Sequence, residues 1–112
     1  MPVLDAAAII NAHFAEGTTV PEVIGELKDF ESRELANAKV SEGRLVVRSP
    51  SKESVEEARK AASPKLSATD LQVLALGLEL KEEIVTDDYA LQASAKRLGI
   101  RFRPVIFTGI NP

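Results

Sequence analysis

The sequence has 112 residues, which is enough for one compact domain. With 45% hydrophobic and 28% charged residues, it is typical of a globular protein and unlike disordered or fibrous chains. The lack of cysteine and the single histidine exclude disulfide scaffolds, thiol chemistry and cysteine–histidine zinc sites, so oxygen atoms must hold any metal ion. The net charge of −3 and the 4% of aromatic residues do not favour binding of nucleic acid by bulk charge or by extensive base stacking.

The N-terminal residues do not resemble a targeting signal. They contain no basic segment, and Asp5 interrupts the first apolar residues too early for a signal peptide. The longest apolar stretch, at 71–80, is too short to span a bilayer. These features predict a cytoplasmic protein that does not enter the membrane.

The first half of the chain alternates strands with helices. Asp5 follows two apolar residues and can cap the helix after it, and Pro21 is typical of a first helical position. Val23, Leu27 and Phe30 recur at helical spacing, with Glu26 beside them. The predicted elements are a strand at 3–4, a helix at 6–14, an extended segment at 17–20, a helix from 21 followed by charged helical residues up to 40, and a strand at 44–48.

The second half continues this alternation. Ser67 and Asp70 form a capping box before a leucine-rich helix with almost no polar face, which predicts a central, buried helix. The predicted elements are helices at 52–62, 67–80 and 89–98, a strand at 83–86, and one or two strands within 100–107. Strands that alternate with helices predict an α/β fold, a three-layer α/β/α sandwich around a parallel sheet. We expect residues 1–108 to form this domain and 109–112 a tail.

Acidic residues follow the predicted strands or begin the predicted helices. Asp5, Asp70 and the pair Asp87 and Asp88 have this placement, and ligands of α/β sheets bind at the carboxyl ends of the strands. Carboxylates that meet there repel one another unless a cation lies between them, which predicts Mg²⁺ or Mn²⁺. Such an ion activates water for attack on a phosphate. Glu26 is the fourth candidate.

A simpler interpretation stays open for each of these residues. Aspartate is favoured at helix N-termini for capping alone, and Glu26 is typical of a solvated helix face. His13 has no second histidine near it and is expected to be a surface or helix-end residue.

Basic residues gather near the C-terminus. Residues 96–112 contain Lys96, Arg97, Arg101 and Arg103 and no acid. A local patch suffices for phosphate contacts, so these four residues are candidates for RNA binding in spite of the net negative charge. Alternatively, Lys96 and Arg97 only complement the end of a helix.

Several segments together resemble the PIN-domain ribonucleases. They are 66–76, 84–92, 19–29 and the opening Val3-Leu4-Asp5, and they cover nearly the whole chain in order. The resemblance is closest to the archaeal and eukaryotic Nob endonucleases, which mature the 3′ end of small-subunit rRNA. It implies an α/β/α sandwich in which an acidic quartet binds Mg²⁺ or Mn²⁺ and cleaves single-stranded RNA, with pre-rRNA as substrate and ribosomal or assembly proteins as partners.

The match to the family identifies the quartet as Asp5, Glu26, Asp70 and Asp88, with the ion on the three aspartates. The family's Thr-x-Asp pattern selects Asp88, with Thr86 as an auxiliary residue and Asp87 as a neighbour that assists or replaces Asp88. Two features depart from the family. Ala6, Ala7 and Ala8 follow Asp5 where the family usually has a serine or threonine that supports the site. The cysteine-rich zinc ribbon of Nob proteins is also lacking, so the sequence is either that domain alone or a version without the ribbon.

Two other functions therefore remain open. One is a toxin-type PIN ribonuclease that pairs with an antitoxin. The other is a catalytically weak PIN module for contacts in ribosome assembly, which the three alanines after Asp5 favour.

Overall fold

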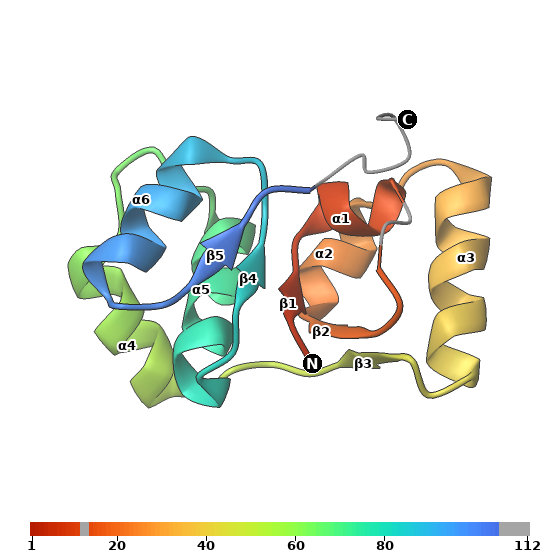
Figure 1. Ribbon diagram of the computed structural model, residues 1–112, viewed down its shortest axis with the longest axis horizontal. Coiled ribbons are helices and arrows are strands. Elements are labelled where there is room, and N and C mark those ends of the chain that lie inside the picture. The colour runs from red at the N-terminus through yellow and green to blue at the C-terminus, as the bar shows by residue number, and fades with distance from the viewer. Residues whose placement is uncertain (12–13, 106–112) are drawn as a thin grey trace.

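The computed structural model describes residues 1–11 and 14–105 and shows a five-stranded sheet with every strand parallel (Figure 1). The strand order is β3-β2-β1-β4-β5. The strands are β1 (Val3–Leu4), β2 (Gly17–Thr19), β3 (Leu45–Val47), β4 (Ile84–Val85) and β5 (Phe102–Arg103). They are short, but β1 and β4 are buried along their whole length, as parallel strands covered on both faces must be.

Helices make the connections between the strands. They are α1 (Ala6–Ile10), α2 (Pro21–Glu26), α3 (Phe30–Ser41), α4 (Lys52–Ala61), α5 (Ala68–Leu80) and α6 (Tyr89–Arg97). The chain moves outward from β1 to β2 and β3, then crosses back to β4 and β5 on the other side of β1. Right-handed crossovers that run in opposite directions place helices on opposite faces of the sheet. The expected three-layer α/β/α architecture is thus confirmed.

The core lies between the central strands and α5. Val3, Leu4 and Ile84 of the strands and Leu74 and Leu76 of the helix are completely buried. The capping box at Ser67 and Asp70 starts α5 as the sequence predicts. No helix of the described part of the chain is both long and apolar enough to cross a membrane.

The helix predicted from residue 21 onward is in fact two helices. Leu27 leaves the helical conformation, with φ −77° and ψ 110°, and Asp29 caps a new helix by accepting a hydrogen bond from the Ser32 backbone N–H. Phe30 was expected on the buried stripe and is instead 70% exposed, because the break turns it away from the face that holds Val23.

Other expectations near the two ends of the described chain differ from the structure or lie outside the described residues. The helix after Asp5 ends at Ile10, earlier than the predicted residue 14, and His13 is outside the described residues. Within 100–105, only 102–103 form a strand. The predicted domain boundary at 108 and the tail 109–112 also lie outside the described residues.

Candidate active site

The switch in chain direction leaves β1 and β4 side by side, and this is where open α/β sheets bind ligands. Asp5 is the first residue after β1 and Thr86 the first after β4. The backbone N–H of Asp5 donates to the carbonyl oxygen of Val85 at 3.3 Å, which holds the two strand ends together. In Figure 1 both strands point to the upper edge of the molecule, which we call the carboxyl edge.

Asp5 is buried, with 8% of its surface exposed. One carboxylate oxygen, Oδ1, accepts a hydrogen bond of 3.1 Å from the Ala8 backbone N–H and so caps α1. Burial raises the pKa of Asp5; hydrogen bonds from Thr86 and Ala8 lower it, and the negative charges of Asp70 and Asp87 raise it. The structure therefore keeps a carboxylate in a place that opposes its ionisation.

Thr86, Asp87 and Asp88 form the turn from β4 into α6. The Thr86 hydroxyl accepts a hydrogen bond from the Asp88 backbone N–H at 3.0 Å. Oδ1 of Asp88 caps α6 through Ala90 N–H at 2.8 Å and Leu91 N–H at 3.2 Å. Asp87 makes a different contact: its Oδ1 accepts a hydrogen bond of 2.8 Å from the Val105 backbone N–H, which holds the segment after β5 in place.

Asp70 and Glu26 complete the acidic group. Asp70 lies in the first turn of α5, where its carboxylate receives the Ser67 N–H and its own N–H donates to the Ser67 hydroxyl. Burial raises the pKa of Asp70, hydrogen bonds from Ser67 lower it, and the charges of Asp88 and Glu26 raise it. Glu26 is the last residue of α2 and is exposed, in agreement with a position at the rim.

The four carboxylates of the quartet thus come from four different elements to the carboxyl edge, where they interact electrostatically. Asp5 interacts with Asp70, and Asp70 interacts with Asp88 and Glu26. Within residues 1–11 and 14–105, no three acidic or histidine side chains are arranged to hold a metal ion as they stand. The donor chemistry nevertheless fits a hard cation, since all the donors are oxygens and the mutual repulsion is of the kind that a divalent ion relieves.

Capping, the simpler interpretation of the aspartates, is confirmed for Asp5 and Asp88, and Asp70 belongs to the predicted capping box. Capping uses a single oxygen of Asp5 and of Asp88, namely Oδ1. A carboxylate has two oxygens, so the same side chain can fix a helix start with one and take part in chemistry with the other. The two interpretations are compatible, and helix capping sets the orientation of the carboxylates.

The structure places three of the four predicted basic residues away from the carboxylates, and only Arg103 lies at the carboxyl end of its strand, beside Val85. Lys96 and Arg97 lie in the last turn of α6 and Arg101 precedes β5, so all three lie toward the amino ends of the strands. Arg97 donates to the Ala61 carbonyl oxygen at 2.7 Å and joins α6 to α4. Arg103 Nε pairs with Glu83 Oε1 at 2.8 Å and is partly neutralised.

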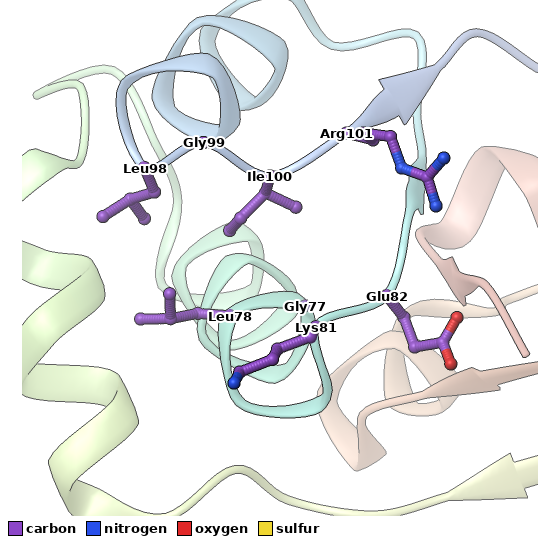
Figure 2. Close-up of a pocket in the computed structure, with 8 residues that line it drawn as sticks. All are labelled: Gly77, Leu78, Lys81, Glu82, Leu98, Gly99, Ile100 and Arg101. Carbon is purple, nitrogen blue, oxygen red and sulfur yellow. The ribbon is translucent and has the colours of Figure 1, made fainter.

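A cavity of about 360 Å³ lies at the edge of the sheet where the strands begin, between the end of α5 and the turn before β5 (Figure 2). Leu78, Leu98 and Ile100 line it, with Lys81 and Arg101 at its rim. It contains none of the quartet residues. We do not assign this cavity as the reaction site, because the carboxylates lie at the other end of the strands.

Comparison with known proteins agrees with this geometry. A family model described as the PIN domain of ribonuclease matches residues 3–80. The chain is 43% identical over 106 residues to "Endoribonuclease Nob1" of Pyrococcus abyssi, a match that covers 90% of this chain and 66% of that protein. It is 40% identical over 112 residues to "Ribonuclease VapC3" of Aeropyrum pernix, covering 88% of this chain and 81% of that protein.

A solved structure has the same fold at much lower sequence identity. FitAcB from Neisseria gonorrhoeae aligns with a TM-score of 0.57 and 12% identity, covering 92% of this chain and 96% of that chain. At this identity the likeness concerns the fold alone. The chain spans just under two thirds of the length of the Pyrococcus abyssi relative.

Proposed function

The chain belongs to the PIN-domain ribonuclease family, and on that premise we propose that it is a divalent-metal-dependent endoribonuclease that cleaves single-stranded RNA. The observation that carries the proposal is the group of mutually repelling carboxylates at the switch point of the sheet. Asp5, Asp70 and Asp88 take part in helix capping, but capping does not require them to lie near one another. Without a cation, the burial of Asp5 and Asp70 and the like charges disfavour this arrangement. Its natural counterpart is Mg²⁺ or Mn²⁺.

Each acidic residue has a definite role in this proposal. Asp5, Asp70 and Asp88 hold the ion, and Glu26, at the exposed rim, orients the attacking water. When bound there, the ion would act as a Lewis acid that activates water and neutralises phosphate charge. Thr86 positions Asp5 and Asp88 through its hydroxyl group, and Asp87 is a positioning residue that anchors the segment at Val105.

We propose cytoplasmic pre-rRNA as the substrate, with cleavage at the 3′ end of the small-subunit RNA and contacts to ribosomal or assembly proteins. The name of the Pyrococcus abyssi relative and its 43% identity support this choice. A second candidate is a toxin-type ribonuclease, which the 81% coverage of the Aeropyrum pernix protein favours. Lys96, Arg97 and Arg101 lie away from the carboxylates, so any RNA that they bind is remote from the cleaved bond, whereas Arg103 ends β5 beside Val85 and pairs with Glu83.

The test is cleavage of a short single-stranded RNA that spans a small-subunit 3′ end, with Mn²⁺, Mg²⁺ or EDTA. Asp88→Asn keeps a good N-cap for α6 but lacks the charge, and we expect it to abolish metal-dependent cleavage. Asp29→Asn is the matched control, since Asp29 also caps a helix but does not belong to the quartet. Full activity in Asp88→Asn would contradict the site assignment.

An unrelated single-stranded RNA of the same length separates the candidate functions. Selective cleavage of the rRNA sequence supports the processing role, whereas equal cleavage of both RNAs supports the toxin-type enzyme. RNA binding by the folded wild type without cleavage at any metal concentration would overturn the enzyme and leave a binding module.

A further inference from the structure

We propose that the exposed face of α6 is a track for single-stranded RNA, on which Tyr89 stacks against an unpaired base and Lys96 contacts a phosphate further along the strand. The inference rests on the proposed ribonuclease function and names how that site holds its substrate. Sequence composition alone argued against aromatic stacking, because the chain has few aromatic residues. The structure shows where one of them lies.

Tyr89 directly follows Asp88 and is 83% exposed. Phe14 and Phe102 are by contrast partly buried against the core. Consecutive Cα atoms are about 3.8 Å apart, so the ring starts within one residue of a carboxylate that the proposal places on the ion. A base next to the cleaved phosphate is therefore within reach of the ring, and every base offers a face for stacking.

The backbone under Tyr89 is held firmly. The Asp88 carboxylate caps the helix at Ala90 and Leu91, and the Gln92 side-chain amide donates to the Thr86 carbonyl oxygen at 2.8 Å. These bonds fix the first turn of α6 to the end of β4, next to the carboxylates. A rigid tyrosine with few rotatable bonds loses little conformational entropy when it stacks, which favours its use as a platform.

The rest of the exposed face suits a polyanion. Tyr89, Ala93 and Lys96 are exposed and lie at i, i+4 and i+7 of the helix, so they share one side. Ala93 is small and leaves room for the sugar-phosphate backbone, and α6 contains no acidic residue. Lys96 lies about 10 Å along the axis from Tyr89 and has no carboxylate within ion-pair distance in the described chain.

Among the described residues, Phe30 is the other strongly exposed aromatic ring, at 70%, and it is a poorer candidate. It lies between Asp29 and Glu31, whose charges repel phosphate and lie outside the quartet, whereas the proposed ion would offset the charge of Asp88 beside Tyr89. It is therefore a matched control with similar exposure and the same helix position but the wrong charge surroundings.

The chain contains no tryptophan, so Tyr89→Trp places a single indole fluorophore on the proposed track. We expect a hydrolysis-resistant, phosphorothioate-linked single-stranded RNA, with Mn²⁺ present, to quench this fluorescence in a saturable way. Duplex RNA should not, because its bases are already stacked. The control variant Phe30→Trp should show no quenching. The track would be overturned if Tyr89→Trp showed no quenching while fluorescence anisotropy reported RNA binding, or if both variants were quenched equally.

Steady-state kinetics provide a second readout. Tyr89→Ala should raise KM for single-stranded RNA by about 5- to 100-fold with little change in kcat, and Tyr89→Phe should restore KM because it keeps the ring. Lys96→Gln should reduce the salt dependence of RNA binding by about 0.7 in the slope of log K against log salt, whereas Lys52→Gln, on α4, should not change it.

The two proposals fail separately. Quenching in the Tyr89→Trp variant without cleavage by the wild type keeps the track and removes the enzyme. Cleavage by the wild type with an unchanged KM in Tyr89→Ala keeps the enzyme and removes the track.

Discussion

Replacing the buried Asp5 with asparagine should stabilise the metal-free protein. Asp5 is 8% exposed and carries its charge among other carboxylates. Asparagine caps helices as well as aspartate does, so its side-chain oxygen keeps the bond from Ala8. Its amide group can donate to the Thr86 hydroxyl in place of the bond that the carboxylate accepts. The change therefore removes the unfavourable charge and keeps the hydrogen bonds.

The pH dependence follows from the direction of the pKa change. Burial and the neighbouring charges raise the pKa of Asp5 above its ordinary value of 3.8, so the folded state holds its proton more tightly than the unfolded state does. The destabilisation is absent below the unfolded pKa, grows as pH rises toward the raised folded pKa, and is complete above it. The advantage of Asp5→Asn should therefore grow over this interval and stay constant at neutral pH.

Removal of a destabilising group from a functional site commonly raises the free energy of unfolding by about 1–2 kcal/mol. For a domain of this size, that corresponds to an increase in Tm of about 4–10 °C. Differential scanning calorimetry in EDTA at neutral pH measures it. In Mn²⁺ the wild type should have the higher Tm of the two proteins. An ion at about 100 times its Kd stabilises the wild type by about 2.7 kcal/mol, and it binds the Asp5→Asn variant more weakly.

Asp29→Asn is the control with the opposite sign. A hydrogen bond from the Ser32 backbone N–H lowers the pKa of Asp29, so its charge contributes stability above the unfolded pKa that is lost as pH falls through the folded pKa. This variant should be no more stable than the wild type at neutral pH. A lower Tm for Asp5→Asn than for the wild type in EDTA would refute the argument that Asp5 is a destabilising charge.

Three further predictions concern α5 and its ends. Ser67→Ala should lower the free energy of unfolding by about 1 kcal/mol in urea titrations, because the Asp70 N–H loses its cap; an unchanged urea midpoint would contradict this. Gly77→Ala should lower the free energy of unfolding by about 1–2 kcal/mol, since the added Cβ would lie 2.7 Å from Cδ1 and Cγ1 of Ile84. If this contact is the cause, adding the substitution Ile84→Val should recover part of the lost stability. Lys81→Gly should raise the free energy of unfolding by about 0.5–1 kcal/mol, because Lys81 has φ 55°, which glycine adopts without strain. It should leave RNA cleavage unchanged, since Lys81 lies at the opposite edge of the sheet. A loss of stability would show that the contacts of the Lys81 side chain outweigh its backbone strain.

The sequence by itself determined the elements that depend on local chemistry. Ser67 and Asp70 mark the start of α5 because capping joins residues three apart, and the leucine-rich run after them could only be a buried helix. The alternation of strands and helices predicted the parallel sheet. Asp5, Asp70 and the pair Asp87 and Asp88 could be named as candidates because each lies where a strand ends or a helix begins, and the resemblance to PIN domains selected Asp88. The break at Leu27 was missed, because helical spacing of apolar residues runs through it.

Only the tertiary structure decided which residues meet. The order of the strands brings Asp5 and Thr86 together across the sequence, and no local pattern contains that order. It also separated Lys96 and Arg97 from the carboxylates, because the direction of α6 takes them away from Asp88. Asp87 and Asp88 are neighbours in the chain, yet one binds Val105 and the other caps α6. Local sequence sets the kind of group that the chain offers, and long-range packing sets its neighbours, and therefore its charge environment and its chemistry.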